Sequence, residues 1–296
     1  MGAPQATTQR QRRQRNDIRP WGPRHGVPSG ARWASAYAGR VGAEPREIEV
    51  QLRALGVRLG GVLVAHTSFR AVRPVEGGPT GLIEALRAAI GPAGTLVMMS
   101  STGNDDEPFD PKRTPASADL GVTADTFWRL PGVLRSNHPQ AFAAAGPQAE
   151  RITQDPVPLP PHIAESPIGR VHELDGQVLL LGVGHDANTT IHLAELFAGV
   201  PYGVPRHCTV VQDGRPVRLD YLENDHCCER FAQVDDWLRE RGLQSEGRVG
   251  NAHARLARAR DVVSVALEHL ADDPLVFLHP PSARCTECDE ARRSVG

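Results

Sequence analysis

The sequence lacks the long apolar runs of a membrane protein. Its longest ones, such as "QVLLLGVG" and "GTLVMMS", fall well short of the roughly 20 residues that span a bilayer, and mean hydropathy is −0.34. Net charge is also small, at −2 with a pI of about 6.6, which argues against a globally basic nucleic-acid binder. Lysine is almost absent: Lys112 is the only one, so arginine carries nearly all of the positive charge. Because no charged segment followed by an apolar run opens the chain, we expect a cytoplasmic protein without a membrane partner.

The chain has an odd number of cysteines, and they do not indicate a disulfide framework. Four of the five lie in two close pairs; the set is Cys208, Cys227, Cys228, Cys285 and Cys288. Without a secretory signal, free thiols or a metal site are favoured over disulfides.

Cys285-x-x-Cys288 has the spacing of half a structural zinc site. Cys228 and His226 could complete the tetrahedron, whereas Cys227 falls in line with the apolar residues of the following helical segment and is expected to face the core. Free buried thiols are the alternative. A catalytic zinc is less favoured, because an all-protein, cysteine-rich site leaves no open position on the metal.

Residues 1–42 differ from the rest of the chain. They are rich in Arg, Gln, Pro and Gly with little apolar periodicity, which predicts a disordered basic arm. A solvated tail is favoured over a nucleic-acid or anionic-surface role. Residues 43–296 form the predicted folded domain.

Within that domain, apolar patterns predict strands alternating with helices. Strands are expected at "GGVLVAHTSF", "GTLVMMSST", "QVLLLGVG" and "PLVFLHPP". Helices are expected at "REIEVQLRALGV", "GPTGLIEALRAAIGPAG", "ADTFWRLPG", "TTIHLAELFAG", "CCERFAQVDDWLRERG" and "ARLARARDVVSVALEHLADD". Alternation on both sides of Asp213–Gly214 predicts a β-hairpin. The fold class is therefore α/β, with a mixed sheet, flanking helices and an inserted hairpin.

The first candidate site is "QVLLLGVGHDANTTIHLAEL", a strand that ends in Gly-x-Gly and leads into a helix. Such a junction lies at the carboxyl edge of a sheet, where open α/β sheets bind ligands. His192 and Glu195 share a helix face, and a carboxylate beside an imidazole raises its basicity. Thr190 could donate its hydroxyl to a developing oxyanion. A core or surface histidine with an ordinary ion pair is the alternative, and His185 is a secondary candidate.

Two further segments carry charge at predicted loop positions. In "HTSFRAVRPVEGGPTGLIEAL", backbone N–H groups at the helix start could hold a phosphate, with Arg70 and Arg73 nearby, although a glycine-rich connection is the alternative. No Gly-Lys-Ser/Thr follows, so this is not a Walker A motif. Two groups of acidic residues follow predicted strands and would suit a polycationic substrate. Solvated surface charge is the alternative. The first group is Asp105, Asp106 and Glu107, and the second is Asp220, Glu223 and Asp225.

Taken together, these motifs resemble the aminoglycoside 3-N-acetyltransferases, a family distinct from the GNAT acetyltransferases. The resemblance covers roughly residues 45–296 and is carried by "HTSFRAVRPVEGGPTGLIEALRAAIGPAGTLVM", "DDEPFDP", "GVTADTFWRLPGV", "RSNHPQAFAAAGPQA", "SPIGRVHELDGQVLLLGVGHDANTTIHLAEL" and "VPYGVPRHC". "DYLENDHCCERF" and "FLHPP…CTECD" look most like the class IV branch, which acts on apramycin and gentamicin-type drugs. The arginine-rich arm departs from the family pattern.

The resemblance implies an antiparallel-rich fold and a residue-by-residue site. His192 would be the general base on the drug's 3-amino group, Glu195 or another nearby carboxylate would orient it, and Thr190 would face the tetrahedral intermediate. Acetyl transfer would be direct, without an acetyl-enzyme, and would give antibiotic resistance. The acetyl-CoA residues would be Thr67, Ser68 and Arg73, and the aminoglycoside cleft would be lined by Asp105 and Glu223. A zinc on Cys285 and Cys288 also fits that branch.

The implied partner is an aminoglycoside, with no nucleic acid bound by the folded domain, in a monomer or homodimer. A zinc-dependent hydrolase that uses the His/Cys cluster is the alternative function.

Overall fold

The computed structural model describes residues 42–154 and 157–295. Within them, one sheet has seven strands in the order β3-β4-β2-β1-β5-β9-β8. Its strands are β1 (Val62–Thr67), β2 (Thr95–Met99), β3 (Leu134–Arg135), β4 (Phe142–Ala145), β5 (Gln177–Leu181), β8 (Gln244–Val249) and β9 (Ala252–Arg258). The central strand β1 pairs in parallel with β2 and β5, and the pairs farther out are antiparallel. The predicted mixed, antiparallel-rich α/β sheet is confirmed.

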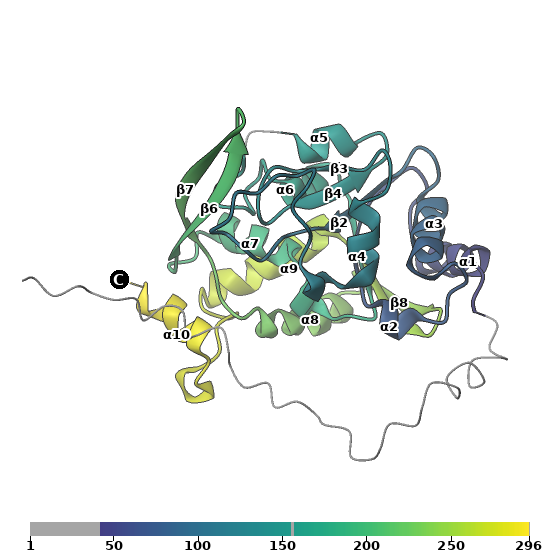
Figure 1. Cartoon of the computed structure of the whole chain (residues 1–296). Coiled ribbons are helices and arrows are strands. Elements are labelled where there is room, and N and C mark those ends of the chain that lie inside the picture. Colours follow the sequence, from purple (N-terminus) through teal and green to yellow (C-terminus); the bar gives the residue numbers. More distant parts are fainter. Residues whose placement is uncertain (1–41, 155–156, 296) are drawn as a thin grey trace, which may run out of the picture. The chain divides into compact units, whose positions relative to one another are not determined.

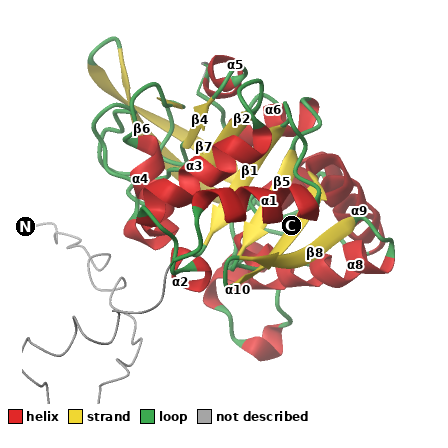
Figure 2. Ribbon diagram, turned by 90° about the vertical axis from the view of Figure 1, so that its right-hand side faces the viewer, coloured by secondary structure: helices red, strands yellow, loops and turns green. Residues whose placement is uncertain are grey.

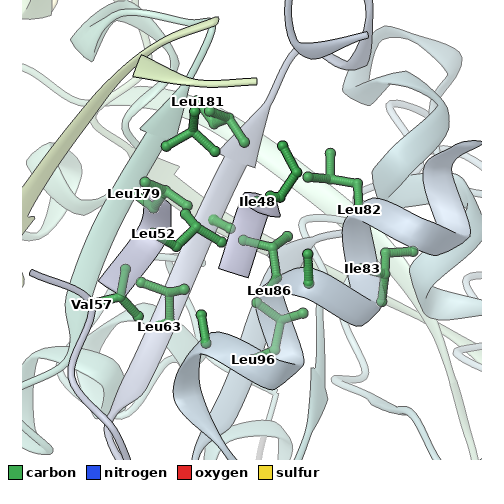
Figure 3. Packing of buried hydrophobic residues seen from close by; sticks show 14 of the residues in the cluster. Ile48, Leu52, Val57, Leu63, Leu82, Ile83, Leu86, Leu96, Leu179 and Leu181 are labelled. Atoms are coloured by element: carbon green, nitrogen blue, oxygen red, sulfur yellow. The ribbon is translucent and has the colours of Figure 1, made fainter. Parts of the chain in front are cut away.

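Period-2 patterning of the central strands gives the sheet two buried faces. In β5, Leu179 points into one hydrophobic cluster while Val178 and Leu180 point into another. Figure 3 shows the first cluster, in which Leu52 and Leu86 pack on the strands. Both faces of the central strands are covered, which explains why these strands read as continuous apolar runs.

Helices cover the two faces of the sheet. The helices are α1 (Pro45–Leu55), α2 (Phe69–Val72), α3 (Gly78–Ile90), α4 (Gly121–Trp128), α5 (Ala149–Thr153), α6 (Pro167–Glu173), α7 (Thr190–Ala198), α8 (Val234–Glu240), α9 (Ala259–Asp272) and α10 (Thr286–Arg293). Figure 2 shows α1 and α3 lying across the sheet, and their buried residues belong to the cluster drawn in Figure 3. On the other face, α5 and α6 pack on the sheet, and α7, α8 and α9 share a third cluster beside it.

The predicted β-hairpin is confirmed as a separate two-stranded sheet, β6 (Val204–Gln212) and β7 (Arg215–Glu223). Its turn has φ of 50° at Asp213 and 75° at Gly214, the two positive values that a tight two-residue hairpin turn requires. The hairpin stands apart from the main sheet in Figure 1. A parallel bridge between Phe109 and Val210 joins it to the acidic loop that follows β2.

Two local predictions were wrong. "ARLARAR" was expected to open a helix, but its first five residues belong to strand β9, and α9 begins only at Ala259. Buried Ala252, Ala254 and Leu256 alternate there with more exposed residues, and antiparallel pairing with β5 selects the extended form. "PLVFLHPP" forms turns rather than a strand, because Phe277 anchors it in the cluster between α7 and α9.

The predicted basic arm, residues 1–42, lies outside the described residues except for Gly42. Among the helices that the structure describes, none has the length and apolar character needed to cross a membrane.

Candidate active site

The site forms where the carboxyl ends of β1 and β5 meet. Their parallel register places Thr67 opposite Leu181, so the loops after both strands open on one edge. Gly182 then turns the chain with a φ of 73°, and a Cβ at this position would lie 2.5 Å from the side chain of Ala71. Beyond this turn, the Asn188 side chain accepts a hydrogen bond from the backbone N–H of Thr190, the first residue of α7, at 3.1 Å.

His192 and Glu195 face one another one turn apart on α7, as the spacing predicted. His192 Nδ1 lies 2.8 Å from Glu195 Oε2, and the carboxylate is fully buried. Its other oxygen accepts hydrogen bonds from Tyr202 Oη and, at 2.8 Å, from His226 Nε2. A buried carboxylate is tolerable only with such partners.

The hydrogen bonds assign the protons of the two imidazoles. His226 Nδ1 accepts from the backbone N–H of Cys228 at 3.1 Å, so its Nε2 carries the hydrogen donated to Glu195. His192 donates through Nδ1 to the same carboxylate, which leaves its Nε2 as the outward nitrogen. That Nε2 lies 3.4 Å from Cys228 Sγ.

Electrostatics favours an ionised carboxylate and a strongly basic imidazole. Burial would raise the pKa of Glu195, but hydrogen bonds from His192 and His226 outweigh it and lower that pKa to about 2. Burial would likewise lower the pKa of His192, but Cys228 and Glu195 together raise it well above its ordinary value. Tyr202 has a raised pKa, from burial and the nearby carboxylate, and remains a hydrogen-bond donor.

His192 borders a cavity of about 340 Å³. Its polar lining residues are His66, Thr67, Asp119, Gln140, His162, Asp186, Thr189, His192, Glu223, Asn224, Asp225 and Cys228. His162 stacks on His192 with ring centroids 4.9 Å apart and planes 14° apart, and Phe231 packs edge-on against the same ring. The reactive imidazole is thus held in place on both sides.

Glu223, at the end of β7, and Asp225 are the residues of the predicted acidic set that line the cavity. Glu223 faces His162 Nδ1 at 4.0 Å, and burial lowers the pKa of that histidine well below its ordinary value. Burial and the neighbouring Asp225 raise the pKa of Glu223 to about 7. Asp225 is already paired with Arg206 at 2.6 Å. Glu223 is therefore the carboxyl group poised to gain from a cationic ligand.

Several predicted residues lie elsewhere. Asp105 is half-buried beside the hairpin and does not line the cavity, and burial raises its pKa. Thr190 does not line the cavity either. It is fully buried, and its hydroxyl has no hydrogen-bond partner in the described part of the chain. Its neighbour Thr189 lines the cavity instead, because the first turn of α7 directs successive side chains to different sides.

Of the predicted cofactor residues, Thr67 lines the cavity, and its buried Oγ1 has no partner among the residues described. Ser68 is half-buried and begins α2. Arg73 is exposed at the end of α2, outside the cavity lining.

The predicted zinc set is not brought together. Cys227, rather than Cys228, joins Cys285 and Cys288, with the three sulfur atoms within 4.8 Å of one another. Cys228 has a left-handed φ of 60°, and this turn sends the two adjacent thiols to different sides. Cys228 contacts His192, and His226 is bound to Glu195.

Sequence reasoning missed His162 and Tyr202, and it placed Cys228 and His226 in the wrong site. "PHIAES" carries no periodic or motif signal for His162. Tyr202 follows the end of α7 by only four residues and is buried. Because a buried tyrosine usually finds a hydrogen-bond partner for its hydroxyl, its position close to Glu195 in the chain was the available signal.

Comparisons with known proteins identify the family of the chain. Residues 64–271 match the family model described as aminoglycoside 3-N-acetyltransferase. The chain is 71% identical over 235 residues to aminoglycoside N(3)-acetyltransferase IV of Salmonella sp, covering 79% of this chain and 90% of that protein.

Two solved structures show the same fold. A variant of aminoglycoside acetyltransferase AAC(3)-IVa in complex with gentamicin has a TM-score of 0.84 and 68% identity, covering 86% of this chain and 99% of the other. AAC-IIIb in a binary complex with CoASH has a TM-score of 0.72 and 26% identity, covering 78% and 97%. The chain belongs to the aminoglycoside 3-N-acetyltransferase family.

Proposed function

We propose that this enzyme transfers the acetyl group of acetyl-CoA to the 3-amino group of 2-deoxystreptamine aminoglycosides and so gives antibiotic resistance. One observation carries the proposal: Glu195 holds His192 by Nδ1, and His192 lines a cavity that Glu223 also lines. The relatives bound to gentamicin and to CoASH support both substrates.

In the proposed mechanism the amine attacks the thioester carbonyl directly. His192 Nε2 takes a proton from the amine as the C–N bond forms, and the resulting imidazolium is stabilised by the buried carboxylate of Glu195. The C–S bond then breaks, and the proton passes to the departing sulfur. Thr67 and Thr189 line the cavity and are the candidate donors to the oxyanion, in place of the predicted Thr190. The buried Thr67 Oγ1 has no partner among the described residues, and the Thr189 hydroxyl contacts Met99 Sδ at 3.6 Å.

The drug would bind on the hairpin side of the cavity. Glu223 would meet one of its ammonium groups, with Asp225 adding negative charge close by. Asp105, which does not line the cavity, would attract the drug at longer range. On the cofactor side, Thr67 ends β1 and Ser68 follows it, and Arg73 would reach the pyrophosphate from its exposed position at the end of α2.

A structural zinc is part of the proposal, with a corrected ligand set. Cys227, Cys285 and Cys288 supply three thiolate-forming side chains at zinc-site separations, and would tie the segment before η4 (Glu229–Gln233) to α10. Metal analysis of the purified protein tests this. A chelator should lower the melting temperature without an immediate loss of turnover.

A zinc-dependent hydrolase is the rival, because His192, His226 and Cys228 also bring ligand atoms within 4.8 Å of one another. Both ring nitrogens of His226 are, however, already engaged, by Glu195 and by a backbone N–H. A chelator that abolishes turnover at once, in a protein that stays folded, would favour this rival.

The deciding experiment measures CoA release from acetyl-CoA with apramycin and with an aminoglycoside that lacks a 3-amino group. Equal rates on the two drugs would refute the proposed position of acetylation. His192→Ala should lose about 10²- to 10⁴-fold in turnover while drug binding is largely kept. His253→Ala, on an exposed strand position, is the matched control and should keep normal turnover.

We place the reaction in the cytoplasm, in a monomer or homodimer, with no nucleic-acid ligand for the folded domain. Deleting residues 1–42 should leave acetylation intact. Steeply salt-dependent DNA binding by the full chain would instead support a binding role for that arm.

A further inference from the structure

Cys228 is a nucleophilic side chain in the site that the direct-transfer mechanism does not use. Its Sγ lies 3.4 Å from His192 Nε2, and His192 Nδ1 lies 2.8 Å from Glu195 Oε2. A thiol, an imidazole and a carboxylate in this order form the nucleophile–base–orienter arrangement of covalent acyl transfer.

The backbone presents this thiol to the cavity. Cys228 has a φ of 60° and a ψ of −3°, a left-handed conformation that is uncommon outside glycine and clusters at functional sites. The side chain is half-buried and lines the same cavity as His192. The Sγ of Cys227, by contrast, lies 3.6 Å from the Sγ of Cys288, on the side of α10. The turn therefore separates a thiol that faces the site from one that faces the tail.

The cavity wall also holds polar atoms suited to an acyl oxygen. Thr67 Oγ1 and His162 Nε2 are buried and have no hydrogen-bond partner among the described residues, and both residues line the cavity. His162 is only 9% exposed. A buried polar atom without a partner carries a free-energy cost that a bound ligand can remove.

We propose that Cys228 is a second acyl acceptor of this site, which takes the acetyl group from acetyl-CoA when no amine is bound. The proposal rests on the proposed function, because acetyl-CoA must reach His192. Cys228 Sγ bonds to the carbonyl carbon, and the bond from that carbon to the CoA sulfur breaks. The thiol proton passes to His192 Nε2 and then to the CoA sulfur. One thioester replaces another, so no oxidant or further reactant is needed.

The thiol and the drug's amine require the same nitrogen. A bound aminoglycoside therefore suppresses acetylation of Cys228, and the S-acetyl form belongs to the enzyme without drug. Water can attack that thioester in turn, which would appear as slow release of CoA in the absence of drug.

The test incubates the enzyme with acetyl-CoA alone, quenches in acid, and measures intact mass, peptide masses and free CoA. We expect one acetyl group on the peptide at Cys228, or steady CoA release that depends on Cys228. Both signals should vanish in Cys228→Ala and Cys228→Ser, and fall at least about 100-fold in His192→Ala. Cys208→Ala, a buried cysteine of the hairpin, is the matched control and should retain them. Adding drug should reduce the adduct.

An enzyme that acetylates the drug but shows neither adduct nor Cys228-dependent CoA release overturns the assignment and leaves the proposed function standing. An adduct mapped to Cys227 or Cys285 overturns it as well. Failure to acetylate any aminoglycoside refutes the proposed function. The two outcomes are distinguishable because the adduct experiment contains no drug.

Discussion

Replacing Glu195 with glutamine tests how the site makes His192 basic. The carboxylate accepts hydrogen bonds from His192, His226 and Tyr202, and it is completely buried. Glutamine has nearly the same shape, but it carries no charge, and its NH₂ group cannot accept a hydrogen bond. Glu195→Gln therefore leaves at least one of the three donors facing another donor.

The expected cost follows from those contacts. A buried donor left without an acceptor costs about 1–3 kcal/mol, which for a domain of this size lowers the melting temperature by roughly 2–12 °C. Turnover should fall about 10²- to 10⁴-fold, because the imidazole loses both its orientation and the charge that stabilises its protonated form.

The pH profile separates this role from a structural one. In the proposed mechanism turnover needs neutral His192, so in the wild type kcat/KM should rise with pH through the pKa of His192, which lies well above the ordinary value. Without the Glu195 charge that pKa falls, and the acid limb of the profile should move to lower pH even though the rate is smaller.

Tyr202→Phe is the matched control, since it removes one donor and keeps the carboxylate charge. It should cost about 0.5–1.5 kcal/mol of unfolding free energy and leave the acid limb in place. A Glu195→Gln enzyme with near-normal turnover and an unshifted limb would refute the assignment of Glu195 as the positioning residue.

Three other substitutions probe the drug side, the turn and the core. Glu223 ionises above a pKa of about 7, so the drug's KM should fall as pH rises through that value, and Glu223→Gln should remove the dependence; a flat wild-type profile would contradict this. Gly182→Ala should lower the unfolding free energy in urea by about 1–3 kcal/mol, because its φ of 73° and the tight space both oppose a Cβ. Gly199→Ala, with a φ of 60° but open space, should lose less, and equal losses would show that the close contact is unimportant. Leu179→Ala should cost about 2–5 kcal/mol in the core, against at most about 0.5 kcal/mol for Leu59→Ala on the surface; similar values would argue against the packing described.

The sequence predicted the elements whose local signals agree with their tertiary environment. The β5–α7 junction has apolar strand residues, glycines and a helical pattern in series, and the hairpin has an Asp-Gly turn between alternating strands. In both segments, the properties of neighbouring residues are sufficient to predict the local structure. His192 and Glu195 were paired correctly because a helix fixes the geometry of residues three apart.

The remaining features depend on contacts between distant segments. Strand β9 contains alanine and arginine rather than β-branched residues, so only its pairing with β5 and β8 makes it a strand. The sequence predicted Cys228 rather than Cys227 in the group with Cys285 and Cys288. The spacing of two adjacent cysteines does not reveal the left-handed turn that separates their thiols. His162 reaches His192 across about thirty positions, and nothing in its own neighbourhood marks it.

The hairpin separates the choice of drug from the chemistry. Thr209 of β6 exchanges backbone hydrogen bonds with Asp105 and Phe109, while Glu223 closes the partner strand β7. Glu223 is thus part of the small sheet and Asp105 is hydrogen-bonded to it, whereas His192 lies on α7, whose buried residues belong to another hydrophobic cluster. In the proposed function, changes in the hairpin would therefore alter which cationic drugs are held while His192 and Glu195 keep their geometry. For the evolution of resistance, the hairpin would then be a segment in which the drug range can shift without disturbing the proposed base.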